Sequence, residues 1–171
     1  SKEAFNASGG FGNIHPGEDP DLSIRLKAIG YKLSLIPQAF VYHKRRLSLD
    51  SFFVQVYKFG QVRPILNKWH PQSKKIAYWF PLAFILGLIL SLFLLIFNFK
   101  LGLYIYSVYF LIAFITALNS TVDVIASILC IPVIIIQFFG YGIGFFKSTL
   151  KLKLSNKPEP LLFPKLFFKI T

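Results

Sequence analysis

Acidic residues, cysteine and methionine are scarce or missing in this sequence. The 171 residues include seven Asp and Glu against 19 Lys and Arg, a single cysteine (Cys130) and no methionine. A lone cysteine cannot close an intrachain disulfide, and no cysteine spacing typical of a zinc site is present. Residues 1–11 are not a charged-then-apolar leader, so they do not resemble a signal peptide. Because position 1 is not methionine, we expect the chain to begin inside a larger protein.

Charge of either sign is also low, whereas apolar residues dominate. Charged residues make up 15% of the chain, against about 25% in soluble domains, while 54% of the residues are hydrophobic and 20 are phenylalanine. The run 76–99 has no charged residue, and a membrane-spanning helix needs about 20 such positions. Two further uncharged runs cover residues 101–122 and 124–146. The composition therefore predicts an integral membrane protein, with two or three transmembrane helices in residues 76–146.

Basic residues flank the apolar region on both sides. Residues 44–75 hold eight Lys and Arg against one acid, and residues 147–171 hold six Lys against one acid. This distribution favours contact with anionic lipid headgroups over contact with a nucleic-acid polymer. Three full crossings would place the two basic segments on opposite sides, contrary to the positive-inside rule. Two crossings plus a re-entrant or interfacial third segment is the alternative. Pro132 and the glycines of residues 140–144 favour an irregular third segment.

The N-terminal segment combines a glycine-rich loop with a marked helix start. The helix is expected to have Asp19 as its N-cap and Pro20 at its first position, and to stop at Gly30. Two short strands are expected after it, at residues 31–36 and 39–42. This segment therefore predicts a small α/β unit.

An amphipathic helix is expected over residues 48–69. Phe52 and Phe53 lie on its apolar side, and Pro64 is expected to kink or end it. A helix with aromatic residues on one face and basic residues on the other commonly lies in the membrane interface. Because the apolar region begins a few residues later, we expect residues 47–75 to form an interfacial helix and linker. A helix packed on a soluble domain is the alternative.

Residues 5–75 contain several motifs that are more specific together than separately. They are Gly9-Gly10-Phe11, then Gly17-Glu18-Asp19-Pro20-Asp21 with Gly30-Tyr31, then Val41-Tyr42-His43-Lys44-Arg45-Arg46. Together they resemble the C-terminal half of the catalytic domain of membrane-anchored bacterial family 2 glycosyltransferases. The resemblance implies an α/β fold of the GT-A type for residues 1–46, followed by an interfacial amphipathic helix and α-helical transmembrane segments. Residues 147–171 would form a basic tail.

The resemblance assigns catalytic roles to two acidic residues. Asp19 would be the general base that takes the proton of the acceptor hydroxyl, and Glu18 would orient the acceptor or that base. Spacing alone favours Asp19 as a helix cap, and one residue can cap a helix and act in catalysis. Asp21 and Arg25 are expected to be structural and to pair at positions i and i+4.

Binding roles are implied for the glycine-rich turn and for two arginines. The turn would shape the acceptor side of the cleft, and the arginines would neutralise the leaving diphosphate or contact lipid headgroups. These residues are Gly9, Gly10, Phe11, Arg45 and Arg46. His43 would bind a metal or the donor diphosphate, or would be a hydrogen-bonded histidine at a strand end. His15 and His70, each beside a proline, receive no role.

The resemblance implies inverting transfer of a sugar from a nucleotide-sugar donor to a lipid-linked or membrane-proximal glycan. The site would face the cytoplasm at the cytoplasmic membrane. A divalent Mg or Mn ion is also implied. The nucleotide-binding half of such a catalytic domain, with the Asp-x-Asp motif that would hold the ion, is absent from this chain, so we do not expect turnover by this chain alone. The Gln-x-x-Arg-Trp motif of processive synthases is missing too, which favours single-sugar transfer. A non-catalytic membrane anchor or assembly module is the competing interpretation.

Overall fold

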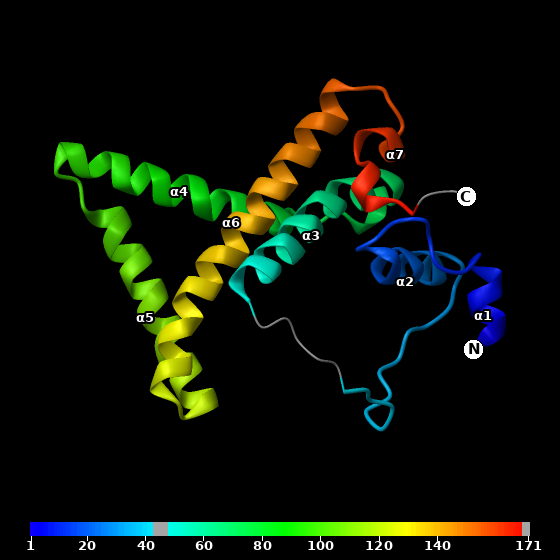
Figure 1. The fold of residues 1–171 in the computed structure, drawn as a ribbon, viewed down its shortest axis with the longest axis horizontal. Helices are drawn as coiled ribbons and strands as arrows, with labels where there is room; N and C mark the ends of the chain where they lie inside the picture. Colours follow the sequence, from blue (N-terminus) through cyan, green and yellow to red (C-terminus); the bar gives the residue numbers. More distant parts are fainter. Residues whose placement is uncertain (43–47, 169–171) are drawn as a thin grey trace.

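The computed structural model describes residues 1–42 and 48–168, and its elements within these ranges are helical (Figure 1). The α-helices are α1 (Lys2–Ala7), α2 (Glu18–Ala28), α3 (Leu49–Trp69), α4 (Phe80–Leu94), α5 (Leu101–Thr121), α6 (Val124–Leu154) and α7 (Glu159–Leu162). Short 3₁₀ helices are η1 (Pro71–Ser73), η2 (Ile76–Trp79), η3 (Leu95–Phe97) and η4 (Pro164–Leu166).

The expected α/β fold is wrong, because the described ranges contain no strand or sheet. Residues 31–42, where the sequence predicts two strands, run as a largely exposed segment with one turn, closed by the Ala39 N–H to Ile36 carbonyl bond. A strand is stable only when its backbone groups pair with a neighbouring strand. Residues 1–42 and 48–168 supply no such neighbour, so the local preference for β structure at 31–36 is not realised.

α3 connects the N-terminal segment to the apolar helices. Its N-cap is Ser48, whose side chain accepts a hydrogen bond from the Ser51 N–H at 3.2 Å. The helix then continues through Pro64 to Trp69. The prediction of a helix over residues 48–69 is therefore confirmed, and the alternative that Pro64 ends it is wrong.

α3 and α6 cross in close contact because small residues line α6 where the two helices meet. Gly140, Gly144 and Ser148 recur every four residues, and all three are buried. A Cβ atom on Gly144 would fall on the backbone carbonyl of Tyr57, and the Ser148 hydroxyl donates to the Gln61 carbonyl at 2.7 Å. Small residues at this spacing let two helix backbones approach closely. The glycines of α6 thus form a helix-packing surface.

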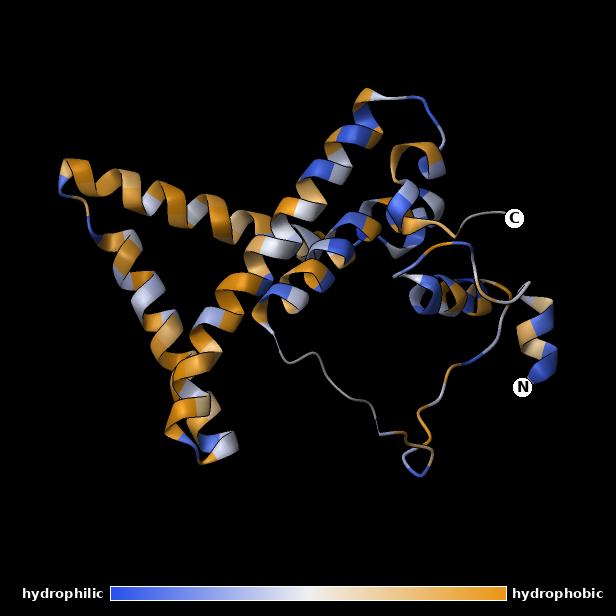
Figure 2. Cartoon of the chain, viewed as in Figure 1, coloured by the Kyte–Doolittle hydropathy of each residue, from blue (hydrophilic) through white to orange (hydrophobic). Residues whose placement is uncertain are grey.

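Three helices are long and apolar enough to cross a membrane, so the chain is a membrane protein as expected. They cover Ile76–Phe97, Leu101–Thr121 and Val124–Leu154, and Figure 2 shows them largely in orange. α6 is one continuous helix through Pro132, so the expectation of an irregular third segment is wrong. At about 1.5 Å per residue, α6 is longer than the roughly 30 Å apolar thickness of a bilayer. Its lysine-containing last turns therefore have the length to extend beyond the apolar layer.

Aromatic rings pack the apolar helices around Phe84 of α4. The Phe84 ring centroid lies 4.9 Å from that of Tyr106 in α5 and 4.3 Å from that of Phe138 in α6. The Tyr106 hydroxyl donates to the Phe84 carbonyl at 2.6 Å, which satisfies this polar group within the apolar region. The tight link expected at residues 98–102 is confirmed, with Asn98 in the left-handed conformation.

The start and the end of the apolar region lie against each other. The rings of Trp79 and Phe145 are 4.9 Å apart, and a Cβ atom on Gly142 would lie 3.1 Å from the backbone of Pro81 and Leu82. In Figure 1, α4, α5 and α6 accordingly form the three sides of a closed triangle. The basic residues just before and just after the apolar region therefore lie side by side, as the positive-inside rule prefers.

The C-terminal segment packs against the loop that precedes α2. The buried core there is formed by Ile14, Val62, Ile65, Leu66, Phe163 and Leu166. The His15 N–H donates to the Leu166 carbonyl at 2.7 Å, and the Phe168 N–H donates to the Asn13 side chain at 3.0 Å. These contacts fix the loop between α3 on one side and the C-terminal segment on the other.

Candidate functional site

Arg25 ties the glycine-rich loop to α2. Its guanidinium donates to the backbone carbonyls of Ser8 and Gly10, the latter at 2.6 Å, and to the Asp21 carboxylate at 2.7 and 3.0 Å. The expected pair of Asp21 and Arg25 is thus confirmed. Gly9 and Gly10 have φ values of 76° and 72°, a region that glycine adopts without a Cβ penalty. The planar fork of arginine is suited to holding several acceptors at once.

Asp21 joins α2 to the end of α3. Its side chain is 5% exposed, and its Oδ1 lies 2.7 Å from Nε2 of His70, the residue at which α3 ends. A Cβ atom on Gly12 would lie 2.5 Å from Oδ2, so the loop backbone closes over this carboxylate. Both Asp21 oxygens are occupied by protein groups, which makes Asp21 a positioning residue. His70 has no role predicted from the sequence, because 49 positions separate it from Asp21 and leave no local pattern.

α2 begins at Glu18, and its N-cap is Gly17. The prediction of Asp19 as the N-cap is therefore wrong. Gly17 has a φ of 125°, and a Cβ atom there would lie 2.5 Å from the Val62 side chain, so the position favours glycine on two counts. Glu18 and Asp19 occupy the first turn, where the positive end of the helix dipole favours carboxylates.

Asp19 is exposed, and it forms no hydrogen bond or ion pair with residues 1–42 or 48–168. The alternative that Asp19 only caps the helix loses its geometric basis, since Gly17 holds the cap position. A carboxylate that neither caps a helix nor pairs with a described cation can approach a substrate hydroxyl.

Glu18 is held by His15 and keeps one oxygen unpaired. Nδ1 of His15 lies 2.9 Å from Oε1, while Oε2 is buried without a hydrogen-bond partner in the described part of the chain. Burial acts to raise the pKa of Glu18, but hydrogen bonds from backbone N–H groups and from His15 outweigh burial and hold the pKa below its ordinary value. Glu18 is therefore anionic at neutral pH, and Oε2 can accept a hydrogen bond from a hydroxyl group.

The remaining predicted site residues fall into two groups. Phe11 lies in the loop that Arg25 holds, is 57% exposed, and packs edge-on against Phe5 with ring centroids 5.4 Å apart. The structure thus brings the Gly-Gly-Phe turn and the Glu-Asp motif onto one supported unit. His43, Arg45 and Arg46 lie outside the described residues, so their roles stay predictions.

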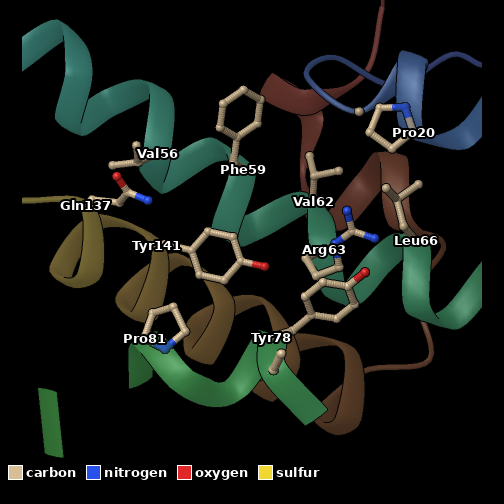
Figure 3. Close-up of a pocket in the computed structure, with 12 residues that line it drawn as sticks. Pro20, Val56, Phe59, Val62, Arg63, Leu66, Tyr78, Pro81, Gln137 and Tyr141 are labelled. Carbon is tan, nitrogen blue, oxygen red and sulfur yellow. The ribbon is translucent and has the colours of Figure 1, made fainter. Parts of the chain in front are cut away.

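A pocket of about 450 Å³, here called the interfacial pocket, lies between the start of α2 and the helices α3, η2, α4 and α6 (Figure 3). Gly17 and Pro20, which flank the Glu-Asp pair in sequence, line it. The Arg63 guanidinium lies 4.4 Å from the centroid of the Tyr78 ring, and Figure 3 shows the Tyr141 hydroxyl on the same side of the pocket. The other lining residues are Val56, Phe59, Val62, Leu66, Ala77, Pro81 and Gln137.

A second pocket of about 490 Å³ adjoins the interfacial pocket. Pro20, Arg63 and Tyr78 line both pockets, and Lys27 and Lys75 add two more cations to the second. Three cations around one pocket suit an anionic group such as a phosphate. The sequence did not reveal this grouping, because its cations come from α2, α3 and the segment before η2.

The described residues do not assemble a metal site. Residues 1–42 and 48–168 contain no group of three His, Cys, Asp or Glu side chains that could hold a metal ion. Glu18, Asp19 and Asp21 lie close in sequence, but Asp21 is occupied by Arg25 and His70. Magnesium requires a near-octahedral set of oxygen ligands. The described residues therefore supply no ligand set for the divalent ion that the resemblance implies, and that ion stays a prediction.

Comparison with known proteins gives one match. The family model described as "Glycosyl transferase family group 2" matches residues 1–139, from the glycine-rich loop into α6. No curated protein and no solved structure matches the chain. The matched range contains the Glu-Asp motif, α3 and the first two apolar helices, so the family model covers the polar N-terminal segment together with apolar helices.

Proposed function

This chain belongs to glycosyl transferase family group 2, and on that basis we propose that it serves an inverting sugar transfer at the membrane surface. The resemblance found in the sequence is confirmed, and transfer of a sugar by a membrane protein is the coarse function. The proposed donor is a nucleotide sugar, and the proposed acceptor is a glycan linked to a membrane lipid. The proposed location is the cytoplasmic membrane, with α2 facing the cytoplasm.

The observation that carries this proposal is the position of the interfacial pocket. Its wall includes Gly17 and Pro20, the two neighbours of the Glu-Asp pair, and it extends to Pro81 and Tyr141 of the apolar helices. An acceptor with a lipid tail needs a site in which its sugar reaches a polar group while its chain stays in the bilayer. The interfacial pocket has both surroundings, and positioning of this kind lowers the barrier to reaction.

The adjoining pocket supports an acceptor that carries a phosphate. Lys27, Arg63 and Lys75 surround it, and Arg63 also lines the interfacial pocket. Lipid-linked glycans are commonly joined through phosphate or diphosphate groups, which arginine and lysine bind through charge-assisted hydrogen bonds. We therefore place the lipid phosphate at these cations and the acceptor sugar toward α2.

In the proposed reaction Asp19 takes the proton of the acceptor hydroxyl while that oxygen attacks the anomeric carbon of the donor sugar. The new bond joins the acceptor oxygen to the anomeric carbon. The bond between that carbon and the diphosphate oxygen breaks, and its electron pair leaves with the nucleoside diphosphate. Glu18 accepts a hydrogen bond at Oε2 and orients the acceptor.

The other parts of the donor site are also proposals. Arg45 and Arg46 would stabilise the departing diphosphate, and Gly9, Gly10 and Phe11 would shape the acceptor side. A divalent ion, with His43 as one candidate ligand, would supply further charge stabilisation when bound. The described residues provide no other ligand set for it, so the steps above depend on the side chains alone.

Substitution of Asp19 by asparagine in the full-length protein tests this function. Membranes are incubated with a panel of radiolabelled nucleotide sugars and a lipid extract, and labelled lipid is counted. We expect transfer to fall by roughly 10²- to 10⁴-fold, the usual contribution of a general base, while donor binding persists.

Asp50→Asn is the matched control, because Asp50 is also an exposed carboxylate in the first turn of a helix. This variant should transfer sugar at the wild-type rate. Equal transfer by wild type and Asp19→Asn would remove Asp19 as the base. Absence of both transfer and donor binding in all three proteins would overturn the proposed activity.

A further inference from the structure

A third pocket, here called the lysine pocket, lies on the other side of α3 from the acidic motif. It has a volume of about 640 Å³ and is formed by the end of α3, the segment from η1 to η2, and the last turns of α6. Its lining residues are Pro64, Asn67, Lys68, Lys74, Lys75, Ile76, Trp79, Phe145, Thr149, Leu152 and Lys153. None of the roles assigned above requires this pocket.

The lysine pocket carries excess positive charge. Four of its lining residues are lysines and none is acidic. Lys68 is paired with Glu159 of α7, with 2.6 Å between its Nζ and a carboxylate oxygen. Lys74 and Lys153 are exposed and form no ion pair with residues 1–42 or 48–168. The pocket therefore favours an anion.

Part of the lining of the same pocket is apolar and lies at the start of the first apolar helix. Ile76 is 91% exposed and Trp79 is 44% exposed, at the point where the first apolar helix begins. Tryptophan at a helix start is typical of the level of the lipid headgroups. A ligand that fills the pocket therefore places its negative charge by the lysines and apolar chains beside Ile76 and Trp79.

Two residues that line the pocket each have a buried polar atom without a partner in the described part of the chain. Oδ1 of Asn67 and Oγ1 of Thr149 are buried without a hydrogen bond in the described part of the chain, and both residues line the pocket. A buried polar group without a hydrogen bond destabilises the folded protein, so such groups usually have a ligand or water as a partner. The threonine hydroxyl can donate to a phosphate oxygen, and the asparagine oxygen can accept from a hydroxyl.

We propose that the lysine pocket binds the headgroup of an anionic, hydroxyl-bearing phospholipid of the phosphatidylglycerol class. Lys74 and Lys153 contact its phosphate together with Thr149, and Asn67 accepts from its headgroup hydroxyl. Basic pockets between transmembrane helices are known lipid headgroup sites. Because α3, η2 and α6 all contribute, the bound lipid links the interfacial helix to both ends of the apolar region.

Quenching of Trp79 fluorescence by brominated lipids tests this proposal in the full-length protein. The protein is reconstituted in phosphatidylcholine vesicles with increasing brominated phosphatidylglycerol or, separately, brominated phosphatidylcholine. The difference between wild type and Trp79→Phe isolates the Trp79 signal. We expect half-maximal quenching at a fraction of the anionic lipid that is at least about 25 times lower than the fraction of the neutral lipid, since two basic residues contribute about fivefold each.

Two variants separate charge from folding. The double variant Lys74→Gln, Lys153→Gln should lose about 25-fold of the preference for the anionic over the neutral lipid. Each basic residue near an anionic surface contributes about fivefold, and the two contributions multiply. Thr149→Val replaces the hydroxyl by a methyl group of nearly the same shape and leaves the charge unchanged. This variant should lose severalfold of the preference for the anionic lipid. The matched control Lys157→Gln, Lys165→Gln removes two lysines that do not line the pocket and should keep the preference.

Three outcomes would overturn the proposal. One is equal quenching by the two lipids in wild type, and another is unchanged preference in both pocket variants. The third is reversal of quenching by millimolar inorganic phosphate, which would identify a site for the free ion. Transfer of sugar is not measured here, so failure of the catalytic proposal would leave this result unaffected.

Discussion

Replacement of Arg25 by lysine tests how the glycine-rich loop is held beside the acidic motif. Lysine keeps the positive charge next to Asp21, but its single ammonium cannot reproduce the fork that also contacts the carbonyls of Ser8 and Gly10. We therefore expect the ion pair to persist and the two loop contacts to be lost.

The size of the effect follows from those two contacts. A hydrogen bond to a charged group contributes about 1.5–3 kcal/mol, and the Arg25 side chain is 26% exposed, so the lower end applies. The two loop contacts together then stabilise the closed loop by about 3 kcal/mol. Their loss corresponds to roughly a 100-fold increase in local opening of the loop.

Hydrogen–deuterium exchange of the full-length protein measures this opening directly. Amides of residues 8–12 should exchange roughly 100-fold faster in Arg25→Lys, while exchange in α5 stays unchanged. Lys27→Gln, a change at an exposed residue of the same helix, should leave residues 8–12 as in wild type. Equal exchange of the loop in Arg25→Lys and wild type would refute the role given to the guanidinium fork.

Two other predictions follow from the helix crossing and from the acidic motif. Gly144→Ala puts a methyl group on the Tyr57 carbonyl and should lower the stability of the protein by about 1–3 kcal/mol, seen as a lower midpoint of thermal aggregation in detergent. Glu18 has a lowered pKa in the folded protein, so the unfolded state takes up its proton first as the pH falls. Its stabilising effect should be complete above the ordinary glutamate pKa and should be lost as the pH falls through the lowered pKa of the folded protein. Unfolding midpoints of wild type and Glu18→Gln should therefore converge in acid.

The helices of this chain could be predicted because local signals determine them. The uncharged runs exceed the length of a membrane crossing, and Ser48 supplies a cap directly before α3. The pair of Asp21 and Arg25 was predictable for the same reason, since four positions along a helix place two side chains on one face. Asp19 was misassigned as the cap because the helix begins one residue before it, after Gly17, whose φ of 125° and close approach to Val62 are not signalled by a capping side chain.

The features that could not be predicted depend on contacts between distant segments. Strands at residues 31–36 and 39–42 require partner strands, and the described residues contain none. The contact of His70 with Asp21 and the pockets around α3 arise only when α3 packs against α2 and α6. The glycines of α6 indicated an irregular segment, because a glycine that weakens an isolated helix can equally serve a tight helix crossing.

Photocrosslinking from the interfacial pocket tests the central claim, that the acceptor lies between the acidic motif and the apolar helices. Phe59 lines the pocket and Phe53 does not, although both are partly exposed aromatic residues of α3. Each is replaced in turn by p-benzoylphenylalanine in the full-length protein, which is then illuminated in membranes during turnover with radiolabelled nucleotide sugar. If the acceptor lies in this pocket, labelled lipid product is attached at position 59 and little is attached at position 53. Equal labelling at both positions, or labelling at position 53 alone, would contradict it.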